Sequence, residues 1–271
     1  MTPTYTTLSL ELNDNIAHLQ LNRPDRANAM NQAMWQELGE AMAWVDKTPE
    51  VRVVVLSGNG KHFCAGIDLG MLNELIDDSI SCEGRKREAL RGEILHLQRQ
   101  LTAIANCRKP VLAAIHGACV GGAVDMITAC DMRYCTEDST FSIKEIDIGI
   151  VADVGTLQRL PRLIGDGLMR ELAYTGRNFD GQEATSMGLN NQCFADKDSL
   201  MAHVLSIAST IAAKSPLSIR GSKDVILYSR EHSVGDGLNY VATWNAGMMI
   251  SEDIKIALKA QKKGESPVFD D

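Results

Sequence analysis

The sequence predicts an α/β fold in which strands and helices alternate early and helices alone follow. The first 140 residues repeat an order of strand, strand and helix without a strict sequence repeat. The last seventy residues show helical periodicity and almost no strand signal. We therefore expect a core over residues 1–199 and a helical region over residues 200–271 that packs on the core or mediates oligomerisation.

Elements of the first half follow from periodicity and turn chemistry. Thr6–Leu12 and Ile16–Leu21 alternate around the turn-forming Asn13–Asn15, which predicts an antiparallel hairpin. The later segments predicted as helices are Asn28–Val45, Met71–Asp78, Arg85–Asn106 and Ala123–Cys130. Those predicted as strands are Val51–Leu56, Val111–Ile115, Asp131–Cys135 and Thr140–Ser142.

Elements of the second half are mainly helical. Leu157–Ile164, which contains Pro161, leads into the first of them. The predicted helices are Gly167–Tyr174, Asp180–Ser186, Leu200–Ala213, Pro216–Ser229, Gly235–Ser251 and Glu252–Lys262.

Composition narrows the function classes. The net charge of −8, without a long basic block, disfavours nucleic acid or an anionic membrane as the main partner. No apolar run reaches the roughly 18 residues of a membrane span, and no signal peptide pattern opens the chain. Seven cysteines without a CxxC pair favour a reducing compartment. We expect a soluble cytoplasmic protein, and no metal-ligand spacing stands out.

Two loops that follow predicted strands present glycines beyond the sheet edge. One is His62–Asp68 (HFCAGID), and the other contains Gly121 and Gly122, which open a helix. Glycine allows backbone N–H groups to approach a ligand, and the first amides of a helix have no partner. The amides of Ile67 and Gly122 could therefore form an oxyanion hole. The glycines alone favour a tight turn and a close helix crossing over an oxyanion hole.

Three carboxylates lie among small or apolar neighbours. Asp125 falls in the first turn of the helix that Gly122 begins, where it could also act only as a dipole partner. Glu145 follows a short strand, and Lys144 beside it could be a mere salt-bridge partner. Asp153 lies between Ala152 and Val154 without a nearby cation, so it is the hardest to explain as a surface residue. Apolar surroundings should raise the pKa of each carboxyl.

These segments together resemble the crotonase superfamily of enoyl-CoA hydratases and isomerases. The resemblance rests on HFCAGID with GACVGGAVDMITACD, followed by FSIKEIDIGI and TLQRLPRLIG, and extends over nearly the whole chain. It implies a spiral of ββα units whose C-terminal helices assemble homotrimers, commonly paired into hexamers. It also implies an acyl-CoA thioester substrate whose carbonyl lies between the Ile67 and Gly122 amides, with no separate cofactor.

Within this superfamily the acids decide the reaction. Hydratases carry glutamate at the positions that match Asp125 and Glu145, whereas the set Asp125, Glu145 and Asp153 is most similar to Δ3,5-Δ2,4-dienoyl-CoA isomerases. The resemblance implies an isomerase of fatty-acid β-oxidation that removes a proton from C2 and adds one at C6. We assign C2 to Glu145 and C6 to Asp153, although the reverse assignment fits the sequence equally well.

The resemblance also implies residues that hold coenzyme A. Arg26 is expected near the pantetheine and phosphates, and Ala65 and Asp68 near the adenine pocket and the loop turn. Lys262 or Lys263 could reach the nucleotide in its own subunit or in a neighbouring one. Solvated surface charge is an equal alternative for each cation.

Two rival functions remain open from the sequence. An enoyl-CoA hydratase would use Asp125 and Glu145 to activate water and leave Asp153 as a structural residue. A catalytically idle CoA-binding or RNA-binding homologue is disfavoured by the negative charge and the intact set of three acids.

Overall fold

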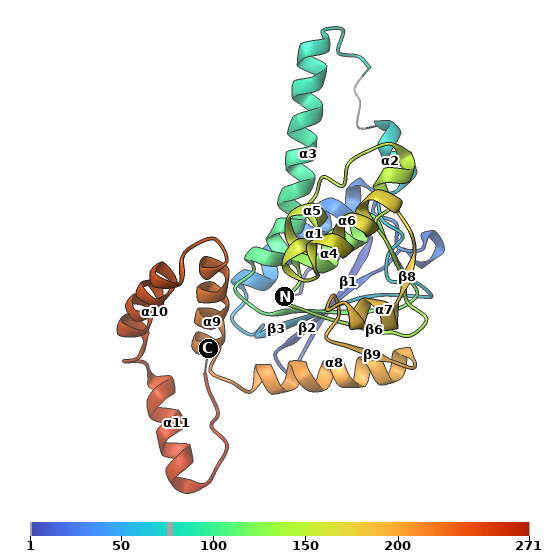
Figure 1. Cartoon of the computed structure of the whole chain (residues 1–271). Helices are drawn as coiled ribbons and strands as arrows, with labels where there is room; N and C mark the ends of the chain where they lie inside the picture. The colour runs from blue at the N-terminus through green and yellow to red at the C-terminus, as the bar shows by residue number, and fades with distance from the viewer. Residues whose placement is uncertain (1, 75–77, 271) are drawn as a thin grey trace.

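A six-stranded sheet runs through the body of the protein in the computed structural model, which describes residues 2–74 and 78–270 (Figure 1). In spatial order its strands are β1 (Leu8–Asn13), β2 (Ile16–Leu21), β3 (Val53–Gly58), β4 (Val111–Ile115), β6 (Met132–Thr136) and β9 (Gln192–Phe194). Within the described part of this sheet, β1 and β2 pair antiparallel and the other neighbouring strands pair parallel. A smaller sheet contains β5 (Ala118–Val120), β7 (Thr140–Ser142) and β8 (Phe179–Asp180).

The predicted hairpin is confirmed. Leu8 pairs with Leu21, and the register continues to Asn13 and Ile16 at the turn. Asp14 and Asn15 both have positive φ, 49° and 65°, which is the backbone of a tight two-residue hairpin turn. Asparagine and aspartate tolerate this conformation better than other side chains, so the sequence signal had a direct physical cause.

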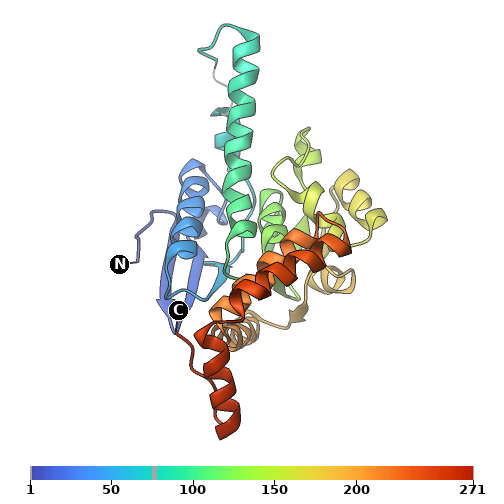
Figure 2. The same ribbon diagram turned by 90° about the vertical axis from the view of Figure 1, so that its left-hand side faces the viewer.

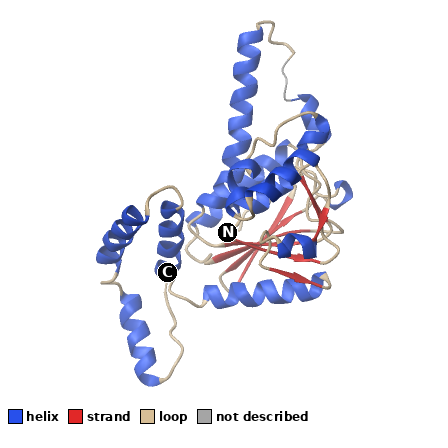
Figure 3. Ribbon diagram, viewed as in Figure 1, coloured by secondary structure: helices blue, strands red, loops and turns tan. Residues whose placement is uncertain are grey.

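Helices cover both faces of the large sheet (Figure 3). On one face, α1 (Gln32–Lys47), α3 (Glu83–Asn106) and α4 (Gly122–Ala129) share a core with Val54 and Leu56 of β3. On the other, α8 (Lys197–Ala212) packs on Val53 and Val55. Because successive side chains of a strand point to opposite faces, the apolar run of β3 serves both cores.

Short elements complete the body. They are η1 (Pro24–Arg26), α2 (Leu69–Glu74), η2 (Glu145–Ile148), α5 (Thr156–Arg159), η3 (Leu160–Arg162), α6 (Asp166–Thr175) and α7 (Gly181–Ser186). The predicted helix Met71–Asp78 corresponds to α2, and its residues 75–77 lie outside the described residues.

Several predicted bounds were wrong for local reasons. The helix expected from Asn28 begins at Gln32, because Ala27 and Asn28 have left-handed φ values of 48° and 55°. Asn31 then caps α1 by accepting a hydrogen bond from the Met34 amide at 3.1 Å. Strands β5, β8 and β9 were missed, since segments of two or three residues carry no period.

The boundary predicted between residues 199 and 200 falls inside α8. The apolar face of this helix, Leu200, Val204 and Ala208, is buried on the sheet. Burial of that face makes α8 part of the body, so the separate helical region begins after Ala212.

The last helices form an arm beside the body (Figures 1 and 2). The arm consists of α9 (Pro216–Ser229), α10 (Val234–Met248) and α11 (Glu252–Lys263). Lys223 of α9 anchors it through an ion pair with Asp131 at 2.7 Å, and Trp244 of α10 packs on Gly221.

Membrane-spanning potential is weak in the described helices. None of them is long and apolar enough to cross a membrane alone, although α8 and α9 satisfy the length and composition criteria as a pair bent by 106°.

Candidate active site

The two glycine-containing loops lie side by side. Cys64 and Cys119 form a parallel bridge, in which the Cys64 amide donates to Ala118 O at 2.9 Å and Val120 donates to Cys64 O at 3.1 Å. The His62 ring also accepts a hydrogen bond from the Ala118 amide at 3.1 Å, so this histidine joins the two loops. The ladder brings the segment after β3 against the segment before α4.

The amides of Ile67 and Gly122 meet at this junction. A Cβ on Gly122 would lie 3.9 Å from the Ile67 nitrogen. The bridge between Met30 and Ile67 uses the Gly66 carbonyl and the Asp68 amide, and no hydrogen bond of the Ile67 amide occurs among the described residues. Gly122 begins α4, where first-turn amides have no partner in the helix. The pair can therefore donate to one ligand oxygen.

Asp125 is the most buried of the three acids. Its side chain is 0% exposed in the first turn of α4, as the sequence predicted for its position. Its Oδ1 accepts a hydrogen bond from the Thr156 amide at 2.5 Å, which attaches the 153–156 loop to this helix. Burial raises the pKa of Asp125 to about 6, even though the Thr156 bond and Arg159 oppose that rise.

Glu145 lies against the glycine pair. Its Oε1 is 3.3 Å from the position that a Cβ on Gly121 would occupy. Burial first, and then the charge of Asp125, raise the pKa of Glu145 to about 7. Among the described residues, Glu145 Oε2 and Asp125 Oδ2 are both buried without a hydrogen-bond partner. Lys144 instead pairs with Asp147 at 2.8 Å, so a salt bridge does not explain Glu145.

Asp153 differs from the expectation of a residue hidden among apolar neighbours. Ala152 and Val154 are buried, but Asp153 itself is exposed. Partial loss of hydration still raises the pKa of its carboxyl. Its negative charge contributes to the raised pKa values of Asp125 and Glu145, so the three acids share one electrostatic site.

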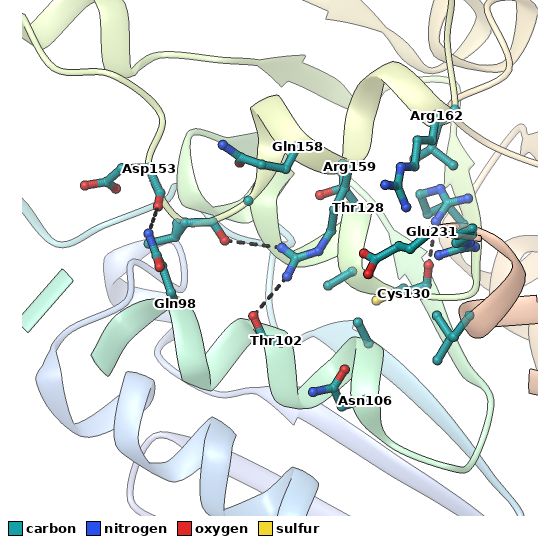
Figure 4. Close-up of a pocket in the computed structure, with 18 residues that line it drawn as sticks. Gln98, Thr102, Asn106, Thr128, Cys130, Asp153, Gln158, Arg159, Arg162 and Glu231 are labelled. Atoms are coloured by element: carbon teal, nitrogen blue, oxygen red, sulfur yellow. Dashed lines mark hydrogen bonds between the residues drawn. The ribbon is translucent and has the colours of Figure 1, made fainter. Parts of the chain in front are cut away.

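A cavity of about 880 Å³ lies beside the Asp153 loop, between α3, α4 and the arm, and Asp153 is among the residues that line it (Figure 4). In Figure 4 the Asp153 carboxyl points away from the other labelled residues, while its main chain faces Gln98.

Only some of the residues expected to hold coenzyme A lie close together in the structure. Arg26 and Ala65 are both exposed, and the Ala65 amide donates to Ala27 O at 2.9 Å, so their segments are adjacent. Asp68 forms an ion pair with Arg23 at 3.0 Å, which lowers the pKa of Asp68 and joins the two segments. Sequence reasoning missed Arg23, because nothing local marks a partner forty-five residues away.

Lys262 and Lys263 lie at the end of α11, far from the loops at Ile67 and Gly122 in the same chain (Figure 1). Both are exposed. One chain therefore does not bring these lysines together with its own Arg26 and Ala65. Elsewhere in the described residues, no cluster of three or more side chains suits a metal ion.

Known proteins resemble this chain in sequence and in fold. Residues 11–263 match the family described as enoyl-CoA hydratase/isomerase. A relative from Arabidopsis thaliana, named peroxisomal Δ(3,5)-Δ(2,4)-dienoyl-CoA isomerase, is 49% identical and covers 98% of this chain and 97% of its own. A mouse relative of the same name, described as mitochondrial, is 47% identical over 90% of this chain and 76% of its own.

The fold expected from the loop motifs is confirmed by a solved structure. A crystal structure of an enoyl-CoA hydratase from Bacillus anthracis superposes with a TM-score of 0.87 at 29% identity, covering 98% of this chain and 99% of that one. The names of the two relatives mention peroxisomes and mitochondria, so they lend no support to the expected cytoplasmic location. The chain belongs to the enoyl-CoA hydratase/isomerase family.

Proposed function

We propose that this protein is a Δ3,5-Δ2,4-dienoyl-CoA isomerase of fatty-acid β-oxidation. The observation that carries the proposal is the set of three acids with raised pKa values beside two adjacent free amides. The names of relatives at 47–49% identity support the same reaction. Coenzyme A is part of the substrate, and the chemistry needs no other cofactor.

The first step removes a proton from C2. The thioester oxygen accepts hydrogen bonds from the Ile67 and Gly122 amides, which stabilise the negative charge of the dienolate. Glu145 is the base, because it lies against Gly121, next to the oxyanion amides, and C2 is bonded to the thioester carbonyl carbon. A base must approach its proton to about 3 Å, and this acid is placed at the correct end of the substrate.

The second step adds a proton at C6. Asp153 delivers it from its carboxylic acid form, the electrons of the dienolate shift to give the 2,4-diene, and Glu145 retains the proton from C2. Burial raises the pKa of Asp153, and bound substrate would exclude water and raise it further. Asp125 holds Thr156 and raises the pKa of Glu145. Proton exchange with solvent restores the starting state.

Substrate binding involves both loops and the arm. Arg26 and Ala65 lie where one face of coenzyme A would meet the chain, with Asp68 holding the loop in place. Lys262 and Lys263 would serve the site of a neighbouring subunit, since they are remote from their own. A homotrimer, or a hexamer of two trimers, would supply that neighbour through the exposed apolar residues of the arm. A cytoplasmic location stays a prediction.

The test compares two substrates. Purified protein is incubated separately with a 3,5-dienoyl-CoA and a 2-trans-enoyl-CoA while absorbance follows the conjugated thioester. Rapid formation of 2,4-dienoyl-CoA with little hydration supports the isomerase. Rapid hydration without dienoyl conversion would replace it with a hydratase, and neither reaction with retained CoA binding would indicate a catalytically idle homologue.

A further inference from the structure

Two side chains outside the acid set hold the main chain of the Asp153 loop. Gln98 of α3 donates from Nε2 to the Asp153 carbonyl at 2.6 Å. Arg159 of α5 donates from Nη1 to the Val154 carbonyl at 3.2 Å and from Nη2 to Thr102 Oγ1, also on α3, at 3.0 Å. Figure 4 shows both side chains reaching the main chain of the loop, while the Asp153 carboxyl points away from the other labelled residues.

The loop is shaped to receive Arg159. Gly155 has a φ of +136°, a conformation that other residues rarely adopt. A Cβ on Gly155 would lie 1.8 Å from Arg159 Nη1, so the guanidinium occupies the space that any side chain here would fill. The third attachment is the bond from the Thr156 amide to Asp125. Three residues of the loop, Asp153, Val154 and Thr156, are therefore tied to side chains of α3, α5 and α4.

We infer that Gln98 and Arg159 are positioning residues that aim the exposed Asp153 carboxyl at C6; this inference rests on the proposed function. Among the described residues the Asp153 carboxyl bonds to no other side chain and only to its own backbone, so its direction depends on the main chain. A displacement of 1 Å can cost about 10²-fold in rate. Glu145 lies on η2, a separate element, so loss of the loop ties affects the C6 step and spares the C2 step.

The experiment separates the two proton transfers in deuterium oxide. Wild type, Gln98→Ala and Arg159→Met are given 3,5-dienoyl-CoA, and two quantities are measured: kcat for formation of the 2,4-isomer, and deuterium incorporation at C2 of recovered substrate. Both variants should lose about 10-fold in kcat with little change in KM and with C2 exchange within about 2-fold of wild type. Arg159→Lys, which keeps a donor, should recover part of the loss.

The matched control is Gln100→Ala. Gln100 lies on the same helix and bonds to His96 rather than to the loop, so this variant should keep both quantities. Unchanged isomerisation in Gln98→Ala, or a parallel fall in C2 exchange, overturns the inference. Gln98→Ala removes only one partly exposed side chain, so this variant should fold. It therefore tests the inference even if Arg159→Met does not fold. A wild type that neither isomerises nor exchanges C2 would overturn the proposed function itself.

Discussion

Helix α4 at the site and helix α10 in the arm contain similar proportions of apolar residues but have opposite environments. All eight residues of α4 are buried, including the charged Asp125. Within α10, only Gly237 is buried. The large apolar residues left exposed around α10 and α11 are Val234, Leu238, Met248, Met249, Ile250, Ile254 and Leu258.

The difference shows that a single chain buries the helix of its acid site but leaves the apolar surface of its arm exposed. The body encloses its catalytic helix so fully that an acid there has a raised pKa. The arm exposes apolar surface that a monomer rarely keeps, and burial gains about 25 cal/mol per Å². We infer that the acids belong to the chemistry of a single body, whereas the arm requires a second copy of the chain.

The largest expected effect is a loss of isomerisation rate when an acid of the body is replaced. Asp153→Asn should reduce isomerisation by about 10³-fold, since the amide cannot deliver the proton at C6. The melting temperature should not change, because Asp153 is exposed. Asp147→Asn, at another exposed carboxylate, is the control and should retain activity. Near-wild-type turnover of Asp153→Asn would remove this residue from the mechanism.

A second prediction breaks the arm without touching the acids. Leu238→Asp together with Leu258→Asp places charges on the exposed apolar faces of α10 and α11, where a subunit interface would have to desolvate them. The mass in solution, measured by light scattering, should fall from a multiple of 29.6 kDa to 29.6 kDa. Val268→Asp, at an exposed residue after α11, should not dissociate the assembly. A monomeric wild type would contradict this view of the arm.

A third prediction concerns how burial of Asp125 in the body affects the free energy of unfolding. The pKa of Asp125 is about 6 in the folded chain and 3.8 in a model peptide, so ionisation destabilises the fold as pH rises through about 6. Asp125→Asn carries no charge and can still accept the Thr156 hydrogen bond. The free energy of unfolding of this variant should therefore exceed that of wild type by about 1–3 kcal/mol at pH 8, whereas the two should differ little at pH 4. Denaturant titrations at both pH values measure this, and an equal difference at both would contradict the charge argument.

The smallest expected effect is a shift in the pH profile. Glu145 must be ionised to accept the C2 proton, and its pKa is about 7, so kcat/KM of wild type should fall as pH drops through the region of 6 to 7. Asp125→Asn removes the second cause of that raised pKa, so its acid limb should lie at lower pH. An unmoved limb would mean that burial alone sets the pKa of Glu145.

The sequence by itself determined the elements whose signals are local. The Asp14–Asn15 hairpin turn, strand Val111–Ile115 and helix Pro216–Ser229 have the predicted positions, because turn residues, β-branched runs and caps act within a few residues. The glycine pair at the start of α4 also follows from the residues around it in the chain.

Only the tertiary structure decided which distant groups meet. It exposed Asp153 although its neighbours are buried, joined Asp68 to Arg23, and brought Gln98 to a loop 55 residues away. It also placed α8 on the sheet rather than in the arm. The physical reason is that period and turn chemistry specify an element, whereas burial, ion pairs and pKa depend on the packing of elements against one another.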